Sequence, residues 1–218
     1  MNINVTLEAI RRAQILDAAI RTIAEQGADS VTLENIAKAA GLSKGGIIHY
    51  FANKELLFRE AFSQFFDRIF RRSKETMDQF ENPLDRILAF EWLFDRTDPE
   101  IELGYPLLFD CMVRVVRDPA YRSLFHDWVD GWVTLLTDAL NEGVQRGVIN
   151  VSDIDATART ISAIYHGIAT RWYLDPESHS NEWALRSFRL AITALLSDQL
   201  VGQPTGISLQ KGVTNANL

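Results

Sequence analysis

Residues 32–55 constrain the fold more than any other stretch, because they contain three closely spaced helix starts. Thr32, Ser43 and Asn53 each precede a helix-forming segment, and each side chain can accept a hydrogen bond from a free backbone N–H of the first turn. Gly41 lies between the first two segments and can take the positive φ of a tight turn. The spacing therefore predicts a helix-turn-helix, a motif whose second helix enters the major groove of DNA.

The second of these helices, expected over residues 44–50, contains two adjacent glycines. Gly45 and Gly46 each cost about 1 kcal/mol relative to alanine in a helix interior. Close approach of another backbone would explain that cost, because a side chain would hold the other surface away. The alternative is a solvated turn in a helical protein. The neighbouring side chains favour nucleic acid, because their hydrogen-bonding groups suit phosphates and base edges: Ser43, Lys44, His49 and Tyr50.

Charge and composition bound the class of protein. The net charge is −7, but residues 1–74 carry +3 and residues 75–218 carry −10, which suggests two tasks in one chain. No apolar run reaches about 18 residues and no signal peptide is visible, so we expect a cytoplasmic protein without a membrane span. Cys111 is the sole cysteine, which excludes an internal disulfide framework. Its apolar neighbours predict core packing, with a reactive thiol as the alternative.

The whole chain is predicted to be all-α, with about nine helices, because apolar residues recur at three- and four-residue steps and no stretch alternates with period two. We expect a loose arm over residues 1–7 and a first helix from Glu8 that Gly27 ends. The last helix of the helix-turn-helix should continue to about Met77. Further helices are expected to begin at Pro83, near 100 and at 119, and to cover 119–146, 153–174 and 182–200, with a break or kink at Tyr105-Pro106.

Residues 8–60 resemble the DNA-binding domain of the TetR family of bacterial transcriptional regulators almost position for position, in RRAQILDAAIRTIAEQGADSVTLENIAKAAGLSKGGIIHYFANKELL. The resemblance covers about a quarter of the chain. It implies a helix-turn-helix DNA-binding domain of three helices at 1–54 and a larger helical ligand-binding and dimerisation domain at 55–201. It also implies a homodimer formed by the helices at 153–174 and 182–200. Residues 202–218 are predicted to be a disordered tail, because they contain few apolar residues.

By position, the resemblance implies contacts with double-stranded operator DNA from Thr32, Ser43, Lys44, Gly45, Gly46, His49, Tyr50 and Lys54. Of these, Thr32, Tyr50 and Lys54 suit phosphates. Residues 44, 45, 46 and 49 lie nearer to base edges. Many relatives have two aromatic residues before a His-Phe pair, whereas this chain has Ile47-Ile48-His49-Tyr50-Phe51. Arg11 and Arg12 have two open interpretations: they reach a phosphate, or they form an exposed helix end.

The second domain is expected to hold a pocket for an unidentified small-molecule effector. Aromatic residues with a few polar groups are a usual composition for such a site. Ordinary helix core is the alternative for each residue singly. A cationic, a planar hydrophobic or an acyl ligand would fit this composition. The candidate ligand-binding residues are Trp92, Tyr105, Phe109, Arg114, Trp128, Trp132, Tyr165, His166 and Trp172, with Arg171 as a further polar group.

No cofactor and no metal site is expected. His126 and Asp130 can share one helix face, but two ligands do not make a site. Neither a nucleophile–base pair nor a glycine-rich phosphate loop is visible, which argues against an enzyme. The sequence thus predicts a ligand-responsive repressor that a largely apolar or aromatic effector releases from its operator. An activator or ligand-independent regulator of the same fold is the alternative, and a small helical enzyme is a distant one.

Overall fold

The computed structural model describes residues 3–197, and every regular element in that range is helical. Nine α-helices and one short 3-10 helix are present, which confirms the predicted all-α fold for this part of the chain. The bounds are α1 Ile3–Gln26, α2 Leu33–Ala39, α3 Lys44–Tyr50, α4 Lys54–Met77, α5 Pro83–Leu88, the 3-10 helix Glu91–Phe94, α6 Pro99–Val115, α7 Pro119–Gln145, α8 Ile154–Leu174 and α9 Asn181–Ser197. The predicted tail lies outside the described residues.

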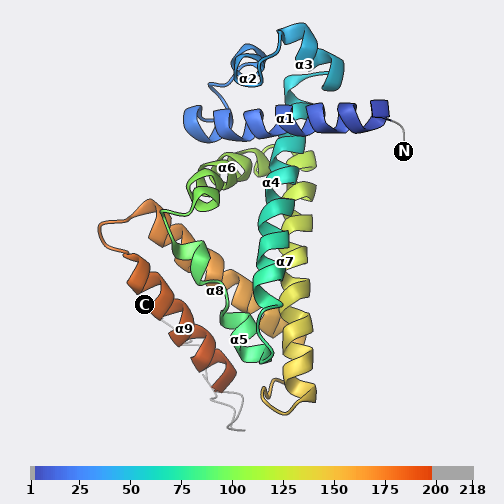
Figure 1. The fold of residues 1–218 in the computed structure, drawn as a ribbon. Helices are drawn as coiled ribbons and strands as arrows, with labels where there is room; N and C mark the ends of the chain where they lie inside the picture. The colour runs from blue at the N-terminus through green and yellow to red at the C-terminus, as the bar shows by residue number, and fades with distance from the viewer. Residues whose placement is uncertain (1–2, 198–218) are drawn as a thin grey trace, which may run out of the picture.

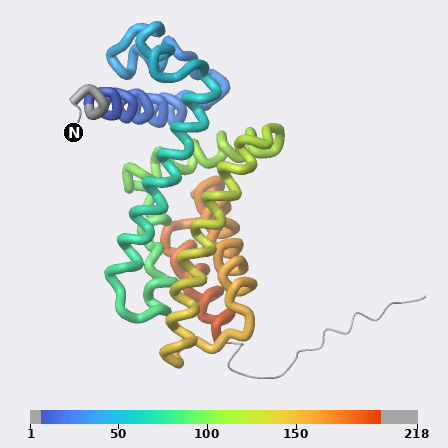
Figure 2. The backbone as a smooth tube through the Cα atoms, turned by 90° about the vertical axis from the view of Figure 1, so that its right-hand side faces the viewer, coloured from blue at the N-terminus to red at the C-terminus, as the bar shows by residue number. Residues whose placement is uncertain are grey.

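The helices form a small head on an elongated body. Figure 1 shows α1, α2 and α3 at one end, with α6 directly beneath α1. Helix α4 leaves the head and runs the length of the body beside α7, as both views show (Figures 1 and 2). Helices α8 and α9 pack on each other on the other side of α7. One long helix therefore connects the head to the body without an intervening loop.

Local sequence signals set the helix ends. Asn53 Oδ1 accepts a hydrogen bond from Leu56 N at 2.8 Å, which caps α4. Asp98, Asp118 and Asp153 cap α6, α7 and α8 in the same way. Gly27 and Gly147 follow α1 and α7 with positive φ values of 77° and 67°, where a side chain would be strained.

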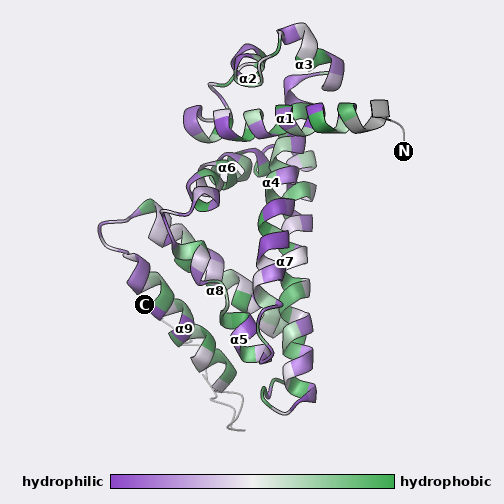
Figure 3. Ribbon diagram, viewed as in Figure 1, coloured by the Kyte–Doolittle hydropathy of each residue, from purple (hydrophilic) through white to green (hydrophobic). Residues whose placement is uncertain are grey.

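Each helix turns an apolar face inward, as Figure 3 shows by colour. Ile15, Ile36, Ile47, Phe51 and Leu57 are fully buried and hold the head together. The same core continues along α4 into the body. None of the described helices is long and apolar enough to cross a bilayer.

Two expectations about helix boundaries were wrong. Helix α1 begins at Ile3 rather than Glu8, because neither glycine nor proline interrupts the chain before Gly27. Helix α6 runs through Pro106 without a break. A proline inside a helix costs about 3 kcal/mol, and burial of the flanking Tyr105 and Leu107 offsets that cost.

Candidate functional site

The helix-turn-helix begins with two side-chain caps. Thr32 Oγ1 accepts from Asn35 N at 3.2 Å, and Asn35 Oδ1 accepts from Thr32 N at 2.8 Å, so the two residues form a capping box. Ser43 Oγ accepts from Gly46 N at 3.1 Å and starts α3. These bonds fix where α2 and α3 begin and therefore which residues face outward.

The eight predicted DNA contacts all lie on α2, α3 and the start of α4, at the outer end of the head (Figure 1). Most of them are exposed, and Gly46, Tyr50 and Lys54 are half-buried. Lys44 Nζ lies 2.7 Å from Glu34 Oε1, and this contact lowers the pKa of the Glu34 carboxyl. A phosphate would have to compete with Glu34 for the Lys44 ammonium group.

The two glycines of α3 are not required by packing inside this chain. A Cβ at Gly45 would meet only Ser43 Oγ, at 3.8 Å. A Cβ at Gly46 would lie 3.5 Å from Ser43 Oγ and 3.6 Å from Leu42 Cβ, which is ordinary contact. The head itself would therefore tolerate alanine at both positions, and their bare backbone suits close approach by an outside surface.

Arg12 bonds other residues of the head, which neither of the two interpretations of the sequence foresaw. Its Nη1 donates to Tyr50 O at 2.8 Å, its Nη2 bonds Glu60, and its guanidinium lies over the Phe51 ring. Arg12 thus ties α1 to the end of α3. Arg11 is exposed and bonds Gln14.

Ile48 is a surface residue of α3 that the candidate set omitted. It is 46% exposed, although its neighbour Ile47 is fully buried. An aliphatic side chain on the outer face of α3 can contact a thymine methyl group. The sequence could have indicated this exposure, because positions 44, 45 and 48 share one face of a helix.

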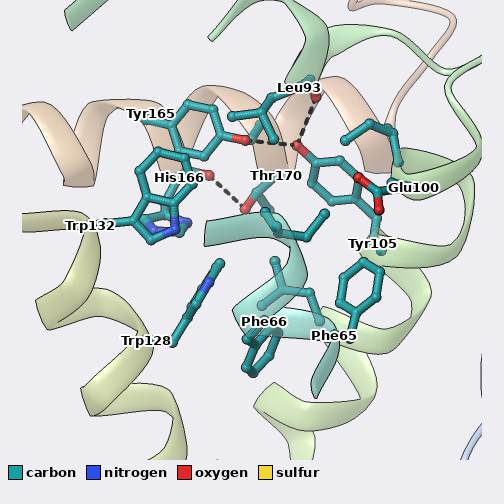
Figure 4. Close-up of a pocket in the computed structure, with 15 residues that line it drawn as sticks. Phe65, Phe66, Leu93, Glu100, Tyr105, Trp128, Trp132, Tyr165, His166 and Thr170 are labelled. Carbon is teal, nitrogen blue, oxygen red and sulfur yellow. Dashed lines mark hydrogen bonds between the residues drawn. The ribbon is translucent and has the colours of Figure 1, made fainter. Parts of the chain in front are cut away.

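The body contains an apolar cavity between α4, α6, α7 and α8. Only about 50 Å³ of it is available to the centre of a water-sized sphere. Figure 4 shows aromatic rings on all sides of it. The lining residues are Phe65, Phe66, Ile69, Leu93, Glu100, Ile101, Gly104, Tyr105, Leu108, Trp128, Trp132, Tyr165, His166, Ala169 and Thr170.

The cavity brings together five of the nine candidate ligand-binding residues: Tyr105, Trp128, Trp132, Tyr165 and His166. The α4 side of the cavity, Phe65, Phe66 and Ile69, was missing from the candidate set. The apolar residues of α4 recur at helical spacing and predict a buried helix face. Periodicity does not distinguish a core face from a cavity wall.

The other four candidates lie elsewhere. Trp172 is fully buried in the core, and its Nε1 donates to Asn181 Oδ1 at 2.9 Å. Phe109 packs on Tyr173, 5.7 Å between ring centroids, and Trp92 lies under the Arg72 guanidinium. Arg114 bonds residues of the head, described below, and the further polar candidate, Arg171, is exposed.

Two arginines of α4, Arg68 and Arg72, bind acidic residues of α6 and its cap. Arg72 donates to both carboxylate oxygens of Asp98, at 3.0 and 2.6 Å. Its hydrogen bonds lower the pKa of the Asp98 carboxyl. Glu100, at the edge of the cavity, has Oε1 3.0 Å from Arg68 Nε and Oε2 3.0 Å from Arg72 Nη1. These ion pairs join α4 to α6.

Burial controls the titratable groups of the cavity. Desolvation lowers the pKa of His166 to about 4, so its imidazole is neutral at pH 7. Desolvation also raises the pKa values of Tyr105 and Tyr165, which stay protonated. Cys111 is buried, as predicted, and its thiol pKa rises to about 12, so it is not a reactive thiolate. The described residues contain no group of three or more potential metal ligands.

Helix α6 connects the cavity to the head. Its first half lines the cavity with Glu100, Ile101, Gly104, Tyr105 and Leu108. Further along the helix, Asp110 Oδ2 accepts from Ala28 N at 2.8 Å. Arg114 then reaches Asp29, in the turn after α1, and Glu55, at the start of α4. Helix α6 therefore contacts both the cavity and the head.

Comparison with known proteins identifies the family. Residues 15–61 match the family described as bacterial regulatory proteins of the TetR family. Residues 83–197, more than half of the chain, match the C-terminal domain of BetI-type transcriptional repressors. The chain belongs to the TetR family. Like other members of the TetR family, it is a DNA-binding transcriptional regulator.

Several known regulators are similar to most of the chain. The transcriptional repressor KstR2 of Mycobacterium tuberculosis is 29% identical over 75% of this chain and 81% of its own length. The fatty acid metabolism regulator protein of Bacillus subtilis is 27% identical over 76% of this chain and 85% of its own. A transcriptional regulator from Saccharomonospora viridis, crystallised with choline, superposes with a TM-score of 0.77 at 22% identity, covering 85% of this chain and 96% of its own.

Proposed function

We propose that this regulator is a repressor that a small, largely apolar or aromatic effector releases from operator DNA. The observation that carries the proposal is the double role of α6, which lines the cavity and bonds the head through Asp110 and Arg114. An effector that separates the cavity walls would move α6 or α4, and both helices contact the head. The effector shifts DNA binding only if it binds the two arrangements with unequal affinity.

In this proposal the protein acts as a homodimer. Paired heads match DNA half-sites about one helical turn, roughly 34–36 Å, apart or a multiple of it. The outer faces of α8 and α9 support such a pairing, because Leu174 and Leu190 are 62% and 69% exposed. A shallow, mainly apolar hollow on α9 includes Leu185, Leu190 and Thr193. Burial of these side chains against a second copy would be favourable.

The proposed division of labour places DNA binding in residues 1–54 and effector binding with dimerisation in 55–201. Phosphate contacts are assigned to Thr32, Tyr50 and Lys54. Base-edge contacts are assigned to the exposed face of α3, where the backbone at Gly45 is unobstructed. The known complex of the Saccharomonospora protein with choline supports a small molecule as the effector. The regulator is proposed to work in the cytoplasm and without catalysis.

A gel-shift series with DNA from beside its own gene tests this function. The wild-type protein should retard one duplex specifically, and Lys54→Ala, which removes a proposed phosphate contact, should weaken binding to all sequences and reduce the salt dependence by about one phosphate contact. Lys38→Ala, an exposed lysine at the end of α2, is the control. A protein that ignores every such duplex contradicts the proposal. Binding that an effector strengthens would indicate an activator.

A further inference from the structure

The side of the cavity formed by α7 and α8 contains ring nitrogens that lack hydrogen-bond partners among the described residues. They are Trp128 Nε1, Trp132 Nε1 and His166 Nε2, and all are shielded from solvent. Figure 4 shows the three rings gathered on one side of the cavity. The Trp128 and His166 ring centroids are 5.3 Å apart. Buried polar groups are almost always paired, so three unpaired nitrogens around one cavity require an explanation.

The missing partner is a hydrogen-bond acceptor. An indole N–H can only donate, which applies to Trp128 and Trp132. The neutral imidazole of His166 carries one N–H, and it can add a third donor if that proton is on Nε2. Among the described residues that line this side of the cavity there is no lysine or arginine, and His166 is neutral, so the donors are dipoles rather than cations.

The hydroxyl groups of the cavity already bond one another or the backbone. Tyr165 Oη lies 3.4 Å from Tyr105 Oη, which lies 3.3 Å from Leu93 O. Thr170 Oγ1 donates to His166 O at 2.8 Å. These contacts are the dashed lines in Figure 4. The hydroxyl groups therefore leave the indole donors unsatisfied.

The charges at the cavity do not favour a cation. Glu100 is the carboxylate of the lining, and each of its oxygens lies 3.0 Å from an arginine nitrogen, on Arg68 or Arg72. Aromatic faces attract quaternary ammonium groups. Here, however, no unpaired carboxylate remains to balance such a charge, and two guanidinium groups lie beside the cavity.

We infer that the effector is a compact apolar molecule with a carbonyl or carboxylate oxygen that accepts hydrogen bonds from Trp128 and Trp132, and that it carries no cationic group. This inference rests on the proposed function, because it gives the chemistry of the effector assigned there. The cavity volume is about one third of the roughly 150 Å³ that holds benzene in an engineered cavity. The ligand therefore contains few non-hydrogen atoms or separates the rings as it binds.

Ring separation would link binding to the head. Trp128 stacks on Phe66 with 4.7 Å between centroids, and Phe66 lies on α4. A ligand that reaches the shielded indole nitrogens moves Trp128 away from this contact, and α4 begins directly at the head.

Three probes with equal numbers of non-hydrogen atoms test the chemistry: pivalate, pinacolone and choline. Pivalate carries a carboxylate and pinacolone a ketone, each on a tert-butyl group. Choline carries a trimethylammonium group, which has the shape of tert-butyl and a positive charge. Isothermal titration of the full-length protein should show pivalate or pinacolone binding at least about tenfold more tightly than choline. Comparing the first two probes shows whether the oxygen belongs to an anion or to a neutral carbonyl.

Substitutions that keep an aromatic side chain but remove the indole N–H test the named donors. Trp128→Phe and Trp132→Phe should each raise the dissociation constant of the preferred probe by about threefold to tenfold. Binding of choline should stay unchanged. Trp92→Phe is the matched control, because Trp92 Nε1 is also buried without a partner but lies outside this cavity. Thermal unfolding of each variant checks that the fold is retained.

Choline binding as tight as that of pivalate and pinacolone would overturn the inference, as would a complete lack of binding by both oxygen-bearing probes. Equal losses of probe affinity in the Trp92→Phe control and in the two cavity variants would overturn the assignment of Trp128 and Trp132 as the donors. Gel shifts run in parallel test the proposed function independently of the effector class. A protein that binds its operator but prefers choline retains the function and refutes only the effector class.

Discussion

Arg114 on α6 donates a hydrogen bond to Asp29 in the turn after α1, with 3.0 Å between Nη2 and Oδ1. Its Nη1 lies 3.2 Å from Glu55 Oε1 at the start of α4. One guanidinium group thus bonds both segments where the head joins the body. Each pair is partly solvated and contributes at most about 1 kcal/mol to stability. These contacts therefore matter more for the orientation of the head than for the stability of the protein.

Arg114→Met should loosen the head while keeping the aliphatic stem of the side chain. We expect operator affinity to fall by about threefold, because binding must then restrict a more mobile head. Amide hydrogen exchange at residues 27–31 should become faster. Arg117→Met, an exposed arginine just beyond the same helix, is the control. Unchanged exchange in this turn would show that the Arg114 bonds do not restrain it.

Gly45→Ala should separate folding from DNA binding. The added Cβ meets no atom closer than 3.8 Å, so the free energy of unfolding should stay the same or rise by up to about 1 kcal/mol. Specific DNA binding should nevertheless be lost or fall by at least about tenfold, because the methyl group holds α3 away from the bases. Thermal unfolding and gel shift measure the two effects.

Gly41→Ala provides the contrasting control for that experiment. Gly41 has φ of 66°, so alanine there is strained and should lower stability. Full DNA binding by Gly45→Ala would contradict the close approach of α3 to the duplex.

Leu190→Glu should disrupt the homodimer. Leu190 is 69% exposed on α9, so the folded monomer tolerates a charge there, whereas an apolar interface does not. Light scattering after gel filtration should show a monomer, and operator affinity should fall by at least about tenfold. Val116→Glu, at a site 76% exposed beyond α6, should remain dimeric. A dimeric Leu190→Glu protein would remove α9 from the interface.

His166 should make stability depend on pH between about 4 and 6.5. The unfolded histidine takes up a proton near its ordinary pKa of 6.5, whereas the buried one does so only near pH 4. The unfolded state therefore binds more protons in this window, and the free energy of unfolding falls as pH falls, by at most about 3 kcal/mol. Urea unfolding at several pH values measures the slope.

His166→Gln should flatten that pH dependence. His126→Gln, which changes an exposed histidine, should keep the wild-type slope. Equal slopes for wild type and His166→Gln would show that His166 is hydrated in solution.

Local interactions made the helix-turn-helix predictable. The caps at Thr32, Ser43 and Asn53 act within three residues, and the turn at Gly41 depends on its own φ. The same local rules predicted the starts of α6 and α7 near 100 and at 119, where the structure shows capping aspartates followed by prolines. Pro106 shows the limit of such rules, because its local signal predicts a break that packing across α6 overrides.

The residues that line the cavity were less predictable from the sequence than the helix-turn-helix. Trp132 and Trp172 both lie on apolar helix faces, yet one lines the cavity and the other is fully enclosed and bonds Asn181. Helical periodicity shows which face of a helix is buried, but it does not show which helix covers that face. Phe65 and Phe66 were missed for the same reason.

The sequence by itself determined the helices, their caps, the helix-turn-helix and the family, because these depend on short-range backbone and side-chain interactions. Only the tertiary structure decided that Arg12 ties α1 to the end of α3, that Arg114 joins body to head, and that Trp128, Trp132 and His166 lie around one cavity with unpaired nitrogens. Those relationships join residues 38 to 85 positions apart, or residues on different helices. They arise when the helices pack, and no local pattern encodes them.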